Sequence, residues 1–184
     1  HLRPRELGLH SFEDYVGLRD KIKEVVPIVN RDRPKTIPPH YREPLTSIGL
    51  PLDLKLDIQT KMQRQLGTLG RGNHFIEIGT NTNAEVCIVI HSGSRKPGWL
   101  LGDYFMKQGR IIEQDHPDAV SYKKAYQVAE DFALYNREVI LVNILKCLKL
   151  GGNLYDYTFS SEIHNQLEWT DPLCDGDIDR YYLH

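Results

Sequence analysis

The sequence predicts an α+β fold with a β-rich core and helices packed outside it, and three observations support this. Hydrophobic residues from 119 to 150 recur at helical spacing, and Gly151-Gly152 ends that pattern. Two short apolar segments, 74–78 and 86–90, flank a turn-forming Gly-Thr-Asn-Thr-Asn segment, which predicts a β-hairpin. The chain has 184 residues, enough for one domain with a substantial core.

The first part of the chain is expected to contribute a helix, a long loop and a second helix. Apolar side chains recur there every three or four residues, at Phe12, Tyr15, Leu18, Ile22 and Val25. Ser11 is a suitable N-cap for that helix. Residues 30–51 are rich in proline and charge, which predicts an extended loop. Residues 54–66 predict a weak helix that ends at Gly67, because glycine readily takes the left-handed conformation that follows many helices.

Further elements are predicted from the hairpin onward. The continuous apolar run 86–90 suits a buried strand. Residues 99–112 predict a shorter helix, and residues 156–159 predict another strand. The helix predicted over 119–150 reaches about 45 Å at 1.5 Å per residue, and it is the element that the pattern supports best.

Composition is typical of a soluble globular protein, with 40% hydrophobic and 26% charged residues. No apolar run approaches the roughly 20 residues needed to span a bilayer, so no membrane partner is expected. Three widely spaced cysteines argue against a disulfide framework and favour a reducing, cytoplasmic location. The net charge is −2, so any contact with nucleic acid must come from a local basic patch.

The most informative segments are two glycine-rich turns that carry histidines. Residues 67–77 read Gly-Thr-Leu-Gly-Arg-Gly-Asn-His-Phe-Ile-Glu, and residues 91–95 read His-Ser-Gly-Ser-Arg. If a strand covers this region, Asn73 and Glu77 share one face and His74 lies on the other, because side chains alternate along a strand. A hydrogen-bonded core histidine would account for His74 taken alone.

Three histidines, His74, His91 and His164, lie at the ends of predicted strands, and such imidazoles suit a transition metal such as Mn²⁺ or Zn²⁺. Their spacing matches no zinc finger. Residues 92–98 contain two glycines and two serines, and together with Arg95 they could cradle a phosphate. An ordinary loop with a surface arginine is the alternative. The segment is not a P-loop, since the Gly-x-x-x-x-Gly-Lys-Ser/Thr pattern is missing from it.

Together these motifs resemble the RtcB family of RNA-splicing ligases. Three further segments agree with the resemblance: Ala133-Leu-Tyr-Asn-Arg137, His164-Asn165 followed by Glu168, and the final Tyr182-Leu183-His184. The last of these resembles the lead into the family's His-Arg-Lys-Gly-Ala segment. The resemblance covers residues 59–184 as a truncated central catalytic region. Residues 1–58 are expected to be a divergent N-terminal helix and Pro-rich loop.

The resemblance implies an enzyme that joins RNA 2′,3′-cyclic phosphate or 3′-phosphate ends to 5′-hydroxyl ends, in tRNA splicing or RNA repair. It implies GTP and two Mn²⁺ ions as cofactors, and RNA ends as the partner. His91 and His164 would bind one Mn²⁺, and His74 would bind the second. The guanine nucleotide would contact Asn73, Glu77 and Asn165, and the RNA-end or nucleotide phosphates would contact Arg95 and Arg137.

The sequence also departs from the family's pattern. Arg71 stands where the family usually has glycine, and Lys96-Pro97-Gly98 replaces the usual Gly-Leu-Gly. The family's Asp-x-Gly-Cys-Gly segment, which supplies metal-bridging residues, is not found, and the guanylylated histidine is expected beyond His184. The abrupt end at His184 therefore predicts the central part of an RtcB-type ligase. The alternatives are a non-catalytic remnant that binds RNA or nucleotide, and a metal-dependent phosphohydrolase.

Overall fold

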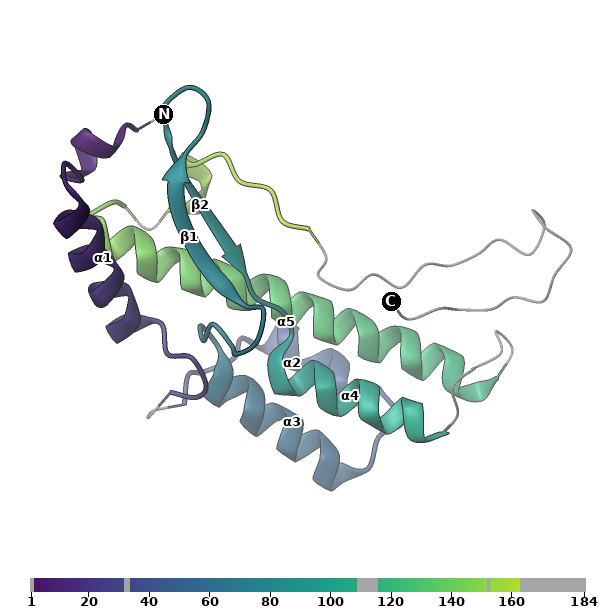
Figure 1. Ribbon diagram of the computed structural model, residues 1–184. Coiled ribbons are helices and arrows are strands. Elements are labelled where there is room, and N and C mark those ends of the chain that lie inside the picture. Colours follow the sequence, from purple (N-terminus) through teal and green to yellow (C-terminus); the bar gives the residue numbers. More distant parts are fainter. Residues whose placement is uncertain (1, 32–33, 109–115, 152, 163–184) are drawn as a thin grey trace, which may run out of the picture.

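The computed structural model describes residues 2–31, 34–108, 116–151 and 153–162. Its elements follow in the order η1 (Pro4–Leu7), α1 (Phe12–Val25), α2 (Pro39–Thr46), α3 (Leu52–Gln65), β1 (Phe75–Thr80), β2 (Val86–His91), α4 (Arg95–Gln108), α5 (Pro117–Cys147) and η2 (Leu154–Asp156). The long helix α5 is the central element (Figure 1). α1, α2, α4 and the hairpin pack against it, and α3 packs on α4 and α2. None of the described helices combines the length and the apolar character that crossing a membrane requires.

A first hydrophobic core lies where α2, α3 and α4 pack with the N-terminal half of α5. The α5 side chains Ala125, Val128 and Phe132 face this core, and Phe132 is fully buried. Their spacing of three and four residues places them on one face of the helix. The core also contains Ile37, Leu45, Ile48, Leu50, Ile58, Met62, Leu66, Leu101 and Phe105.

A second core lies where α1 and the hairpin pack on the C-terminal half of α5. Ile140, Ile144 and Leu148 continue the buried stripe along α5 and its end. From α1, Leu18 and Ile22 enter this core. The hairpin contributes Ile76, Ile78, Ile88 and Ile90. The two cores together bury most of one side of α5, which explains why its apolar residues continue over the whole predicted helix.

The hairpin is antiparallel, and its register runs from Phe75 opposite His91 to Thr80 opposite Val86. Because side chains alternate along each strand, the isoleucines of both strands face the second core. Glu77 and its partner Val89 lie on the opposite face and are exposed. The predicted hairpin is therefore confirmed. β1 begins at Phe75, so Asn73 and His74 precede the strand, and the predicted alternation applies only from Phe75 onward.

Four predicted helices are also confirmed. Ser11 caps α1 by accepting a hydrogen bond from the Asp14 N–H, and the Asp14 side chain accepts one from the Ser11 N–H, which forms a capping box. α3 ends at Gln65, and Gly67 has a φ of +71°, as a glycine after a helix often does. α4 begins at Arg95, four residues before the predicted start. α5 covers most of the predicted 119–150.

The prediction of a β-rich core was wrong for the residues that the structure describes. They contain a two-stranded sheet, and helices supply most of the buried side chains. The run 86–90 is buried on one face only, and Cys87 is exposed on the other face. A short apolar run does not distinguish a strand covered on both faces from one covered on a single face, so the prediction of a buried strand was wrong.

Two smaller predictions also differ from the structure. Within the predicted loop 30–51, α2 forms from Pro39 to Thr46. Pro39 occupies the first helical position, where a missing N–H has no cost, and Leu45 is fully buried in the first core. Burial thus overrides the proline-rich composition. The strand predicted at 156–159 is not formed, because η2 ends at Asp156 and irregular backbone follows it.

Candidate functional site

One buried amide joins both glycine-rich turns to α5. The side chain of Asn136 is 0% exposed. Its Oδ1 accepts hydrogen bonds from the N–H groups of Gly67 and Thr68 at 2.6 and 3.2 Å. Its Nδ2 donates to the Thr68 carbonyl and to Ser92 Oγ, each at 3.1 Å. Asn136 therefore sets the position of the first glycine-rich turn relative to the turn at Ser92.

Sequence reasoning gave no role to Asn136, although the residue lies inside a motif that the resemblance used. A signal was present in the helical pattern. Asn136 is four residues after Phe132 and four before Ile140, so it falls on the buried stripe of α5. A buried amide needs partners for two donors and an acceptor, so an asparagine on such a stripe indicates a hydrogen-bonded contact with another segment.

Arg31 holds the start of the first glycine-rich turn. Its guanidinium donates to the carbonyls of Leu66 and Gly67 at 2.8 and 2.9 Å, and to that of Val25 at 3.1 Å. These carbonyls end α3 and α1, where helical partners are missing and partial negative charge accumulates. Burial lowers the pKa of Arg31 below its ordinary value, but a guanidinium remains charged at neutral pH.

We expect Arg31→Ala to lower the free energy of unfolding by about 1.5–3 kcal/mol, because hydrogen bonds from a charged donor are lost. Urea unfolding followed by circular dichroism measures this loss. Arg19→Ala is the matched control, because Arg19 pairs with its neighbour Asp20 and both side chains are more than half exposed, at 57% and 56%. An exposed pair of this kind contributes about 0–1 kcal/mol. Equal losses in both variants would contradict the capping role of Arg31.

Gly70 allows two predicted site residues to meet. Its φ is +112°, a conformation that residues with a side chain rarely adopt. A Cβ at this position would overlap the ring of His74 and the guanidinium of Arg95. The imidazole and the guanidinium therefore both lie against the backbone of Gly70, which explains one glycine of the motif by geometry.

His74 and His91 come together at the end of the hairpin opposite its turn. Their ring centroids are 5.9 Å apart. His91 also stacks on Phe75, its partner in the strand register, with ring centroids 5.2 Å apart. His164, the third predicted metal ligand, lies outside the described residues. Within the described ranges, no three His, Cys, Asp or Glu side chains form a group that could hold a metal ion.

The predicted nucleotide contacts lie near this pair of histidines in the chain. Asn73 is exposed in the turn that precedes β1, and Glu77 is exposed on the outer face of β1. Asn165 lies outside the described residues. Among the described residues, no hydrogen bond joins Asn73 and Glu77. Their role in binding the guanine nucleotide stays a prediction.

Arg95 opens α4 in a left-handed conformation, with a φ of +56°. This conformation costs a non-glycine residue roughly 1–2 kcal/mol, and such outliers cluster at functional sites. The guanidinium donates to Thr68 Oγ1 at 3.3 Å and to the Ile28 carbonyl at 2.9 Å. Burial lowers the pKa of Arg95 below its ordinary value, and the group remains charged.

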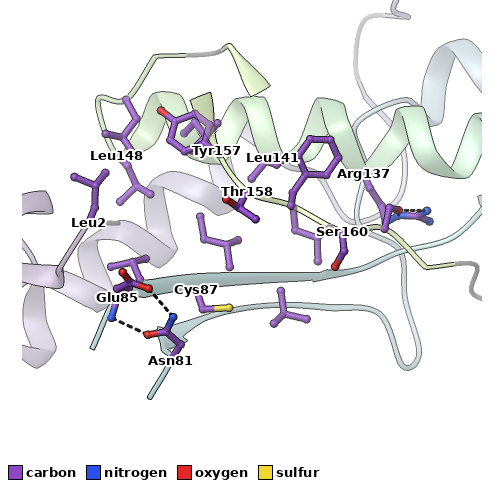
Figure 2. Close-up of a pocket in the computed structure, with 18 of the residues that line it drawn as sticks. Leu2, Asn81, Glu85, Cys87, Arg137, Leu141, Leu148, Tyr157, Thr158 and Ser160 are labelled. Atoms are coloured by element: carbon purple, nitrogen blue, oxygen red, sulfur yellow. Dashed lines mark hydrogen bonds between the residues drawn. The ribbon is translucent and has the colours of Figure 1, made fainter. Parts of the chain in front are cut away.

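Arg137 lies at one end of an elongated cavity of about 950 Å³, between β2, α5 and residues 156–162. Figure 2 shows Leu2 at the opposite end of this cavity. The Arg137 guanidinium donates to the Ser92 carbonyl at 3.0 Å and to Ser161 Oγ at 2.7 Å. Burial lowers the pKa of Arg137 as well, and the negative charge of Glu138 partly opposes this shift. The volume is within the range of small-molecule sites, which is about 300–1,000 Å³.

The two guanidinium groups share one electrostatic property. Among the described residues, the ion pairs include neither Arg95 nor Arg137. Their hydrogen-bond acceptors there are neutral carbonyl and hydroxyl oxygens. Neither group has a carboxylate within ion-pair distance among the described residues, although the negative charge of Glu138 acts on Arg137. An anion beside either half-buried cation would therefore be stabilised. Phosphate fits best, because its oxygens match the planar donors of arginine.

Comparisons with known proteins agree with the motifs. The family model described as tRNA-splicing ligase RtcB matches residues 51–164. The RNA-splicing ligase RtcB of Escherichia coli K12 is 32% identical over 108 residues, which cover 50% of this chain and 26% of that protein. The tRNA-splicing ligases RtcB of Aeropyrum pernix and Nanoarchaeum equitans are each 33% identical, covering 41% of this chain and 22% of their own lengths.

The chain thus spans about a quarter of the length of the curated relatives it matches. The matched region contains both glycine-rich turns, the paired histidines, Asn136 and the two arginines. Because the family model covers more than half of its residues, the chain belongs to the RtcB family of tRNA-splicing ligases.

Proposed function

We propose that this chain is part of a GTP- and Mn²⁺-dependent RNA ligase, which joins 2′,3′-cyclic phosphate or 3′-phosphate RNA ends to 5′-hydroxyl ends. Its family membership and the names of its relatives support ligation of RNA. The observation that carries phosphate recognition is the pair of half-buried arginines that form no ion pair with a carboxylate among the described residues. The setting is tRNA splicing or RNA repair in the cytoplasm.

Arg95 and Arg137 bind the phosphates of the RNA end or of the nucleotide in this proposal. Both guanidinium groups are attached to the segment that follows β2, Arg95 through the chain itself and Arg137 through the Ser92 carbonyl. Fixed cations of this kind offset negative charge as a phosphoryl group is transferred, and they need no rearrangement at that moment. Asn73, Glu77 and Asn165 contact the guanine nucleotide.

His74, His91 and His164 are the proposed Mn²⁺ ligands, with His91 and His164 at one ion and His74 at the other. The donor chemistry of the two described histidines fits, because imidazole binds transition metals and the rings lie 5.9 Å apart. When bound, the metal polarises phosphoryl oxygens. The chain's own contribution is the backbone of Gly70 and the hairpin register, which hold both rings in place.

We expect Arg137→Met to weaken binding of an RNA with a 3′-phosphate by on the order of tenfold, because a charge-assisted contact is lost. For the same RNA with a 3′-hydroxyl end, this substitution should reduce the affinity much less. Fluorescence anisotropy with end-labelled RNAs measures both affinities. Methionine retains the apolar stem of the arginine, and thermal unfolding checks that the variant is folded.

Arg19→Met, which removes an exposed arginine, is the control. Equal affinity of the unaltered chain for both RNA ends would contradict phosphate recognition.

The ligase activity is tested on the protein expressed from its complete coding sequence, incubated with labelled GTP and Mn²⁺. A covalently labelled protein, followed by joining of the two RNA ends, is the expected result. The absence of any labelled adduct would count against the ligase. Release of phosphate from the RNA end without joining would instead identify a phosphohydrolase.

A further inference from the structure

An exposed tryptophan lies one helical turn after Arg95, outside both hydrophobic cores. Trp99 is 54% exposed, whereas Pro97 and Leu101 on the other face of α4 are buried. Lys96 Nζ lies over one face of the Trp99 ring, 3.1 Å from its centroid. A spacing of three residues places Lys96 and Trp99 side by side on a helix. A large aromatic surface and two cations thus lie within the first turn of α4.

The turn that carries Trp99 is held in place by buried contacts. The Lys96 N–H donates to Gln65 Oε1 at 2.9 Å, and Gln65 is itself buried and bonded to Asn30 Oδ1 at 3.1 Å. Gly98 lies so close to Ser94 that a Cβ there would overlap the serine side chain. A rigid surface loses little conformational entropy on binding, so this turn is preorganised for a ligand.

The charges around Trp99 favour an anionic partner. Lys96 and Arg95 are both cations, and Arg95 forms no ion pair with the described residues. One turn beyond Trp99, the carboxylate of Asp103 pairs with Lys107 at 2.7 Å, so its negative charge is offset. Asp103 is spaced four residues after Trp99 and three before Met106, so the two exposed apolar side chains of α4 do not form a continuous stripe for an apolar protein helix.

We propose that the face of Trp99 opposite Lys96 is a stacking platform for an unpaired RNA base, and that Lys96 contacts the phosphate beside that base. The inference rests on the proposed function, because it places an RNA phosphate at Arg95. Aromatic rings next to cations are the usual means of binding single-stranded nucleic acid. Every base has a π face, so the platform accepts all four bases. Trp99 then positions the strand whose terminal phosphate the arginines bind.

Tryptophan fluorescence tests the platform directly, because a stacked base quenches the indole. The sequence contains one other tryptophan, Trp169, so Trp169→Phe leaves Trp99 as the only reporter. Short single-stranded oligouridine and oligoadenosine with 3′-hydroxyl ends are the probes. We expect both oligonucleotides to quench the Trp99 fluorescence in a saturable way. The Trp99→Ala variant should bind them on the order of tenfold more weakly than the unaltered chain. Trp99→Phe should retain most of the affinity. Lys96→Met should weaken binding and reduce its dependence on salt.

Phe12→Ala is the control, since Phe12 is an aromatic residue on α1 with 78% exposure, and its loss should leave RNA affinity unchanged. RNA binding without quenching, or unchanged affinity in Trp99→Ala, would overturn the proposal, and so would failure to bind either RNA. The proposed function is tested separately, and it fails if the chain binds RNAs with a 3′-phosphate and a 3′-hydroxyl end equally well.

Trp99→Ala removes the stacking surface and should weaken binding of both kinds of RNA equally. The failure of the stacking proposal and the failure of the proposed function are therefore distinguishable.

Discussion

Replacing Asn136 with alanine is expected to lower the free energy of unfolding by about 3–5 kcal/mol. The amide satisfies the N–H groups of Gly67 and Thr68, the Thr68 carbonyl and Ser92 Oγ, all within a buried site. Each buried polar group that loses its partner costs about 1–3 kcal/mol. Ser92 Oγ keeps its bond to the Leu69 carbonyl at 2.7 Å, and the Thr68 N–H keeps its bond to the Gln65 carbonyl at 3.0 Å, so the loss is smaller than four full penalties.

Thermal and urea unfolding measure the effect, and a loss of this size lowers the Tm of a chain this long by on the order of 10 °C. Asn143→Ala is a closely matched control, because it removes the same side chain from the same helix two turns later. Asn143 makes one long contact of 3.4 Å to the Val25 carbonyl. Similar changes in Tm for the two variants would show that Asn136 does not join the turns. Asn136→Asp should not restore stability, since it removes both donors and buries a charge.

Gly70→Ala is the second substitution with a large expected effect, about 3 kcal/mol or more. Its φ of +112° is unfavourable for alanine, and a positive φ of this kind costs roughly 1–3 kcal/mol. In addition, the new methyl group would overlap His74 and Arg95, which must then move. The substitution should therefore disturb the proposed metal and phosphate groups together, and weaken binding of RNA with a 3′-phosphate.

Gly72→Ala separates the two causes. Gly72 also has a positive φ, +77°, but nothing lies within 4 Å of the position that a Cβ would take. This variant should show the conformational cost alone. NMR signals of the His74 and His91 rings should shift in Gly70→Ala and remain in place in Gly72→Ala. Equal destabilisation of both, with unchanged ring signals, would contradict the close packing at Gly70.

Local sequence patterns predicted the helices and the hairpin whose formation depends mainly on residues within the same segment. The periodicity of α5 and α1, the capping box at Ser11 and the turn chemistry of the hairpin each lie within a short segment. Strand alternation also predicted correctly that Glu77 lies on the opposite face of the first strand from Ile76 and Ile78. The motifs named the two arginines and the two described histidines, although their chemical roles are still proposals.

Contacts between distant segments were not predictable in the same way. α2 forms in a proline-rich segment because Leu45 is buried by α3 and α5, which lie far along the chain. Cys87 is exposed because the hairpin is covered on one face only. The role of Arg31 depends on carbonyls up to 36 residues away, where two helices end. Composition carries no information about such neighbours.

The sequence by itself determined the family, most helices, the hairpin and the residue types of the candidate site. The reason is that helical and strand periodicities and glycine-rich motifs are local properties of the chain. The tertiary structure alone decided that Asn136 joins both turns, that Gly70 brings His74 and Arg95 together, and that Trp99 remains exposed. These features depend on which segments meet in space, and packing around α5 determines that arrangement.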